Sequence, residues 1–147
     1  MTSNRKDCKM KRETADRHLR EVACRIKEVN DNPDFCYTIT EAYVFGSFVN
    51  SDAEMVSDLD IALRMERRCP TTSEQYRRRQ AQCPYMSDDL MWLIWPKEEV
   101  LRYIRHRSGY ISLHVLGDPE QDAIIFSDKV QQIGVSGQAV NPTGGEE

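Results

Sequence analysis

The stretch VFGSFVNSDAEMVSDLDIAL, residues 44–63, contains the features that decide the fold. It begins at the end of an aromatic and β-branched run, residues 35–45, which predicts a strand. Gly46-Ser47 breaks that strand, and a short polar segment, residues 50–57, follows. Residues 59–63 are apolar around one aspartate and predict a second strand. The stretch is therefore expected to join two strands through a tight turn.

The segment before this stretch predicts a helix over residues 11–30. Its apolar residues are spaced by three or four positions and form one face, with charged residues outside it. They are Ala15, Leu19, Val22, Ile26 and Val29. A turn at residues 30–34 ends this helix before the first strand.

The segment after the stretch predicts alternating helices and strands. Thr71 and Glu74 have the spacing of a capping box, which predicts a polar surface helix through Gln82. Residues 89–95 are apolar enough for a central strand, and Pro96 is suited to the first turn of the next helix. A last strand is expected at residues 110–116, followed by a turn at Gly117-Asp118-Pro119.

This order of elements predicts one α/β (α+β) domain, with a small mixed β-sheet and helices packed on one face. A chain of 147 residues has room for one compact core. The expected division is a flexible N-terminus at residues 1–10, a domain at residues 11–133 and a disordered tail at residues 134–147, which is rich in Gly, Ser, Pro and Glu.

Composition excludes several classes of function. The net charge of −4 does not favour nucleic acid as a partner. No apolar run is long enough to cross a bilayer, and the polar, basic N-terminus has no apolar core of a signal peptide. Five cysteines without a C-x-x-C pair are expected to be reduced thiols, and the three scattered histidines do not suggest a zinc site. The sequence therefore predicts a cytoplasmic protein without a membrane partner.

Asp58 and Asp60 are the residues of greatest chemical interest. Side chains at i and i+2 of a strand share a face, so two carboxylates would lie about 7 Å apart along the backbone. Burying them unpaired would cost several kcal/mol. Either Asp58 lies outside the strand in a solvated loop, or a divalent cation sits between them. Hard oxygen ligands of this kind suit Mg²⁺. Gly46 would let a phosphate approach the backbone, and Ser47 could add its hydroxyl or could simply cap a short helix.

In this ordered combination, residues 44–63 resemble the G-S…D-x-D signature of the DNA polymerase β-like nucleotidyltransferase superfamily. The small size is closest to the minimal nucleotidyltransferase (MNT) family, including its antitoxins. Residues 89–115, DLMWLIWPKEEVLRYIRHRSGYISLHV, resemble that family's third core strand, the helix after it and its last strand. The sequence departs from the family in having Phe48-Val49-Asn50 where many members carry a basic residue and a glycine.

The resemblance implies a role for each matching residue. Asp58 and Asp60 correspond to the paired metal-binding carboxylates, and Gly46 and Ser47 correspond to the turn that holds the nucleotide phosphates. A third catalytic and metal-binding carboxylate is expected on the following strand, where Asp89 matches best and Asp88 is the competitor. Two Mg²⁺ ions are implied as cofactors, with ATP as the substrate.

The same resemblance implies transfer of AMP to a hydroxyl of a protein acceptor, in the manner of an antitoxin that modifies a partner toxin of the HEPN class. Two alternatives stay open. One is transfer to a small molecule such as an aminoglycoside, which similar enzymes achieve with an extra helical domain. The other is a partner-binding module with a degenerate site. The sequence does not define the base preference or the oligomeric state.

Overall fold

The structure is a computed structural model, and it describes residues 9–69, 71, 73–75, 77–78 and 89–135. Its centre is a four-stranded sheet with the order β5-β4-β2-β6. β2 pairs antiparallel with β4 and with β6, whereas β4 pairs parallel with β5. These strands are β2 (Tyr37–Phe45), β4 (Leu59–Arg67), β5 (Ile111–Val115) and β6 (Gln131–Ile133).

Two short strands, β1 (Met10–Lys11) and β3 (Met55–Val56), form a separate antiparallel ladder beside the start of the first helix. β1 begins one residue before the predicted domain boundary at residue 11. Met10 is buried in the core, so the ordered domain includes it. The predicted tail lies outside the described residues from residue 136 onward.

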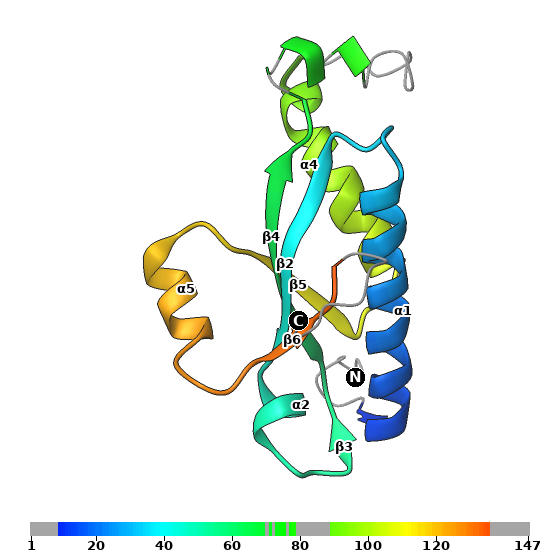
Figure 1. The fold of residues 1–147 in the computed structure, drawn as a ribbon. Helices are drawn as coiled ribbons and strands as arrows, with labels where there is room; N and C mark the ends of the chain where they lie inside the picture. The colour runs from blue at the N-terminus through cyan, green and yellow to red at the C-terminus, as the bar shows by residue number, and fades with distance from the viewer. Residues whose placement is uncertain (1–8, 70, 72, 76, 79–88, 136–147) are drawn as a thin grey trace, which may run out of the picture.

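Helices α1 and α4 lie side by side against one face of the sheet (Figure 1). The short helix α5 lies on the other side of the sheet. The mixed α/β class is confirmed, whereas the prediction that the helices pack on one face is wrong for α5. The described helices are α1 (Arg12–Asp31), α2 (Ser47–Asn50), α4 (Asp89–Arg105) and α5 (Pro119–Ile125).

The core lies between the sheet and α1. All five residues of the apolar stripe predicted for the first helix are buried. Facing them, Leu59, Ile61 and Leu63 alternate along β4 and are fully buried. Because strand side chains alternate between faces, Asp60 is directed to the face opposite α1. The apolar stripe of the helix and the alternating apolar residues of the strand, both predicted from the sequence, therefore pack in one core.

The predicted strand at residues 89–95 is wrong. These residues form the first part of α4, which continues through Pro96 to Arg105. A short apolar run fits a buried strand and a buried helix equally well by periodicity, and leucine, methionine and tryptophan lack the β-branching that favours strands. Pro96 is fully buried within the helix, rather than in its first turn.

The capping box predicted at Thr71 is confirmed by a hydrogen bond from the Glu74 N–H to the Thr71 hydroxyl oxygen at 3.1 Å. Residues 73–75 and 77–78 are helical, and the predicted end of this helix at Gln82 lies outside the described residues. α5 and β6 were not predicted. Asp118, expected to begin a turn, caps α5 by accepting a hydrogen bond from the Glu120 N–H at 3.1 Å.

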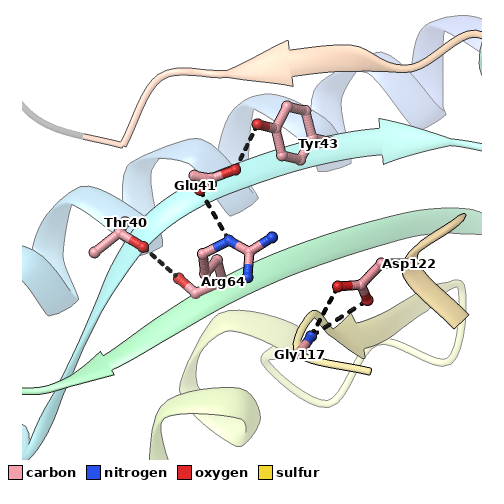
Figure 2. A network of polar contacts seen from close by, with 6 residues as sticks. All are labelled: Thr40, Glu41, Tyr43, Arg64, Gly117 and Asp122. Carbon is pink, nitrogen blue, oxygen red and sulfur yellow. Dashed lines mark hydrogen bonds and ion pairs between the residues drawn. The ribbon is translucent and has the colours of Figure 1, made fainter. Parts of the chain in front are cut away.

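Polar side chains on the face opposite α1 connect β2 to β4 (Figure 2). Glu41 accepts a hydrogen bond from the Tyr43 hydroxyl at 2.7 Å and from the Arg64 guanidinium at 2.8 Å. The Thr40 hydroxyl donates to the Arg64 carbonyl at 3.2 Å, next to the register shift between Ile39 and Glu41. The bond to Glu41 raises the pKa of Tyr43 above its ordinary value. These contacts stabilise the middle of the β2–β4 ladder. They do not involve the end of the ladder at Phe45, where the site described below lies.

Replacing Ile61 by alanine tests the position of the core. Ile61 is fully buried, and the cavity left by truncation is expected to lower the free energy of unfolding by about 2–5 kcal/mol. Ile124 on α5 is 66% exposed, so Ile124→Ala serves as the matched control and should change it by less than about 0.5 kcal/mol. Denaturant unfolding of both variants measures the difference. Equal losses would contradict the assignment of the core to the α1 face.

Candidate active site

The turn after β2 depends on Gly46. Its φ of 81° and ψ of −155° fall in a backbone region that is essentially restricted to glycine. The Gly46 carbonyl accepts the N–H groups of Val49 and Asn50 at 3.1 and 3.0 Å, which closes the single turn of α2. Ser47 follows as the first residue of α2 and is exposed to solvent. The predicted break between strand and short helix is confirmed at these two residues.

Gly46 also makes room for the Asp60 carboxylate. The β2–β4 register places Phe45 opposite Asp60, and a methyl group built on Gly46 would lie only 2.5 Å from Asp60 Oδ2. Asp60 is half-buried, with 29% of its side chain exposed. The structure therefore brings together two of the elements predicted from sequence, the Gly-Ser turn and the second aspartate of D-x-D.

Asp58 lies directly before β4 and is exposed. Of the two arrangements left open by the sequence, the structure has Asp58 outside the strand. Its charge nevertheless acts on Asp60. Burial raises the pKa of the Asp60 carboxyl, His114 lowers it to a smaller extent, and the Asp58 charge raises it further. The site thus carries two interacting carboxylates, one solvated and one partly desolvated.

β4, which carries Asp60, lies between β2 and β5, so residues of β5 flank Asp60 on the side away from the Gly-Ser turn. Ser112 is the register partner of Asp60, and His114 Nε2 lies 3.8 Å from Asp60 Oδ1. The His114 ring also packs edge-on against Phe45, with centroids 5.1 Å apart. Sequence reasoning assigned no role to His114. The alternation of Ser112 and His114 was visible, but it identifies a site only when the parallel pairing of β4 with β5 is known.

The structure does not bring Asp89 together with Asp58 and Asp60. Asp89 is the first residue of α4, and its side chain lies outside the described part of the chain, as does Asp88. The helix runs for 17 residues, or about 24 Å, before the turn that leads to Tyr110. The Tyr110 carbonyl accepts the Leu59 N–H at 2.7 Å, so it is the other end of this segment that lies beside the D-x-D motif. The prediction for Asp89 depended on a strand at residues 89–95, and these residues belong to a helix.

Arg12 holds the loop that follows the Gly-Ser turn. Its guanidinium donates to the carbonyls of Phe48, Ala53 and Ser51 at 2.6, 2.9 and 2.7 Å. It also lies 5.0 Å above the centroid of the Phe48 ring, which packs against the core. These contacts fix the chain on the C-terminal side of α2.

The carboxylates of Asp58 and Asp60 meet part of the coordination that a divalent cation needs. Two carboxylates beside a turn without side-chain bulk fit Mg²⁺, which usually takes only one or two protein carboxylates and completes its shell with water and phosphate oxygens. Within the described residues, no group of three or more His, Cys, Asp or Glu side chains is arranged to hold a metal ion. A cation here would therefore depend on substrate oxygens for much of its coordination.

Comparisons with known proteins assign no family to the chain. No family model, no curated protein and no solved structure matches it. None of the helices in the described ranges has the length and hydropathy needed to cross a membrane.

Replacing Gly46 by alanine tests the close approach to Asp60. The added methyl group would contact Asp60 Oδ2, and the backbone strain alone costs about 1–3 kcal/mol. We expect Gly46→Ala to lower the unfolding free energy, and we expect the loss to shrink when Asp60 is also changed to alanine. A double-mutant cycle by denaturant unfolding measures this coupling. Simple additivity of the two changes would contradict the contact.

The raised pKa of Asp60 predicts how stability changes with pH. A carboxyl whose pKa is higher in the folded state contributes stability below its ordinary pKa, and that stability is lost as pH rises through the folded-state pKa. Asp60→Asn should therefore melt at a higher temperature than the wild type at neutral pH, and the difference should vanish in acid. Thermal melts of both proteins, recorded with a chelator from neutral pH into acid, measure the difference in melting temperature.

The exposed Asp34 provides the matched control, because Asp34→Asn leaves the desolvated carboxyl in place. A lower melting temperature for Asp60→Asn at neutral pH would show that the ionised carboxylate stabilises the fold and would contradict the prediction.

Proposed function

We propose that this protein is a metal-dependent nucleotidyltransferase that transfers AMP from ATP to a hydroxyl of a protein acceptor. The observation that supports it best is the packing of Gly46 against the Asp60 carboxylate at the junction of β2 and β4, with Asp58 next to it. A phosphate group at the Gly46-Ser47 turn would lie next to the carboxylates, as transfer between a triphosphate and a hydroxyl requires.

In this proposal Asp58 and Asp60 would hold Mg²⁺, which would supply positive charge to the triphosphate and to the departing pyrophosphate. The acceptor oxygen forms a bond to the α-phosphorus, and the bond from the α-phosphorus to the bridging oxygen breaks, which releases pyrophosphate. Exposed Ser47 offers its hydroxyl to a phosphate oxygen. Partial burial of Asp60 disfavours its ionised form, and a bound cation relieves that cost.

His114 lies beside Asp60, and we propose it for the role that the resemblance to the MNT family implies for a third carboxylate. It lies on the strand next to β4, 3.8 Å from Asp60 Oδ1 and 44% exposed. We assign to it the proton released by the attacking hydroxyl, because an imidazole is the side chain that most often acts as a general base. In this proposal His114, and not Asp89, activates the attacking hydroxyl.

The choice of a protein acceptor rests on the open character of the site. Asp58, Ser47 and His114 are all exposed, and no other described residue covers them. An acceptor that brings its own surface, such as a helical toxin of the HEPN class, suits a site of this kind better than a small molecule does. Transfer to a small molecule would need further walls around the acceptor.

The proposal is tested by co-expression of the protein with a HEPN-class toxin, followed by intact-mass analysis of the toxin. A transfer assay with each labelled nucleoside triphosphate complements it. The toxin is expected to gain mass in increments of one AMP. Asp58→Asn and Asp60→Asn should each slow transfer by about 100-fold or more, since each removes a negative charge that would hold the Mg²⁺. His114→Ala should lower kcat while the affinity for the triphosphate stays near that of the wild type.

Asp34→Asn, which changes a distant exposed carboxylate, is the control and should transfer at the wild-type rate. Undiminished transfer by both site variants would rule out the assigned site. Protection from the toxin by an Asp58→Asn/Asp60→Asn double variant, without any change of mass, would instead identify a partner-binding module.

A further inference from the structure

The segment between α5 and β6 returns to the Gly-Ser turn. β6 pairs antiparallel with β2, with Gln131 opposite Val44. Continuing this register by two residues places Lys129 beside Gly46. On the other edge of β2, the register places Asp60 opposite Phe45. The Asp60 carboxylate therefore lies on the β4 side of Gly46, and the backbone of Lys129 approaches from the β6 side, where Figure 1 shows the C-terminal segment reaching β2 near α2.

The side chain of Asn50 fixes this arrangement. Its amide nitrogen donates to the Gly46 carbonyl at 3.1 Å and to the Lys129 carbonyl at 3.0 Å. Its amide oxygen accepts the Lys129 N–H at 3.2 Å. One side chain therefore connects the turn to the Lys129 backbone through both its donor and its acceptor. Asn50 belongs to the Phe48-Val49-Asn50 stretch, in which the sequence departs from the MNT pattern.

Lys129 also lines a small cavity beside the turn. The cavity has a volume of about 240 Å³ and is lined by Val49, Asn50, Ser51, Asp52 and Lys129. This is below the roughly 300–1,000 Å³ of a pocket that encloses a whole small ligand, so it would take only part of one. Among the described residues, no carboxylate forms an ion pair with the Lys129 ammonium. Arg12, a second cation near the turn, already donates to three carbonyls.

We propose that Lys129 binds the phosphate oxygens of the nucleoside triphosphate, and that Asn50 is the positioning residue that holds it beside Gly46. This inference rests on the proposed function and specifies how the substrate is recognised. A triphosphate at the turn would lie between the carboxylates with their cation on one side and the lysine on the other. The stretch next to Gly46-Ser47 contains no basic residue, and the charge is supplied from a segment 79 positions later in the chain.

The test compares the affinities of ATP and adenosine for the full chain by calorimetry in the presence of Mg²⁺. Lys129→Met is expected to weaken ATP binding by about 10-fold or more, the usual effect of losing a hydrogen bond between charged groups. Adenosine binding and the melting temperature should not change, because Lys129 is exposed. Lys129→Arg should restore most of the affinity. Asp52→Asn, which removes a negative charge from the same cavity, should tighten ATP binding.

Lys97→Met is the matched control. Lys97 is an exposed lysine on α4 that lies 5.5 Å from the centroid of the Tyr37 ring, and its loss should leave ATP binding unchanged. Asn50→Ala should weaken ATP binding and also lower the melting temperature, since it releases the C-terminal segment from the turn.

The failure of this inference can be distinguished from failure of the proposed function. Unchanged ATP affinity in Lys129→Met, with loss of Mg²⁺-dependent binding in Asp60→Asn, would overturn the role of Lys129 alone. Equal weakening of ATP and adenosine binding in Lys129→Met would show a structural role and would also overturn it. A wild-type protein that binds no nucleoside triphosphate with Mg²⁺ would overturn both proposals.

Discussion

The register between β2 and β4 is the constraint on which the site depends. It pairs Phe45 with Asp60, and it is held by Leu59, Ile61 and Leu63, which are fully buried on the α1 face. A slip of one residue would turn every side chain of β4 to the opposite face, which would expose these apolar residues and bury the Asp60 carboxylate in the core. Hydrophobic packing on one side of the sheet therefore determines which carboxylate reaches the turn on the other side.

Around this register, several local features are unfavourable to folding by themselves. Gly46 has a backbone conformation that other residues rarely adopt, Asp60 is partly desolvated, and Asp58 adds a like charge beside it. Such features persist only where the surrounding structure compensates for them, and they cluster at functional sites. Here the compensation comes from the core beneath the strands, from the hydrogen bonds of Arg12 to the loop after α2, and from those of Asn50 to the Lys129 backbone.

The parts of the fold that follow from local pattern could be predicted from the sequence. The stripe of α1, the strands on either side of residues 46–57 and the break at Gly46-Ser47 each have a periodicity or a turn residue within one short window. The start of α4 could not be predicted in this way, because residues 89–95 are apolar without a clear period. Pro96 was then interpreted as the start of a helix that in fact begins at Asp89.

The neighbours of the site could not be predicted for a different reason. His114 comes to Asp60 through parallel pairing of β4 with β5, and Lys129 comes to Gly46 through pairing of β2 with β6. Both contacts join segments more than 50 positions apart in the sequence. Neither segment contains a local pattern that predicts which strand it pairs with. The sequence alone therefore could not predict that His114 lies beside Asp60, which follows from the parallel pairing of β4 with β5.

The edge strand β6 has a consequence for synthesis of the protein. Since a chain emerges from the ribosome N-terminus first, β2, α2 and β4 can pair while the C-terminal segment is still unmade. Loops that close over long sequence separations also form later than local ones, because they cost more entropy. The carboxylates would therefore meet the Gly-Ser turn early, and Lys129 would join them only when β6 is added. A nascent or truncated chain that lacks β6 would therefore have Asp58, Asp60 and the Gly-Ser turn without the Lys129 segment beside them.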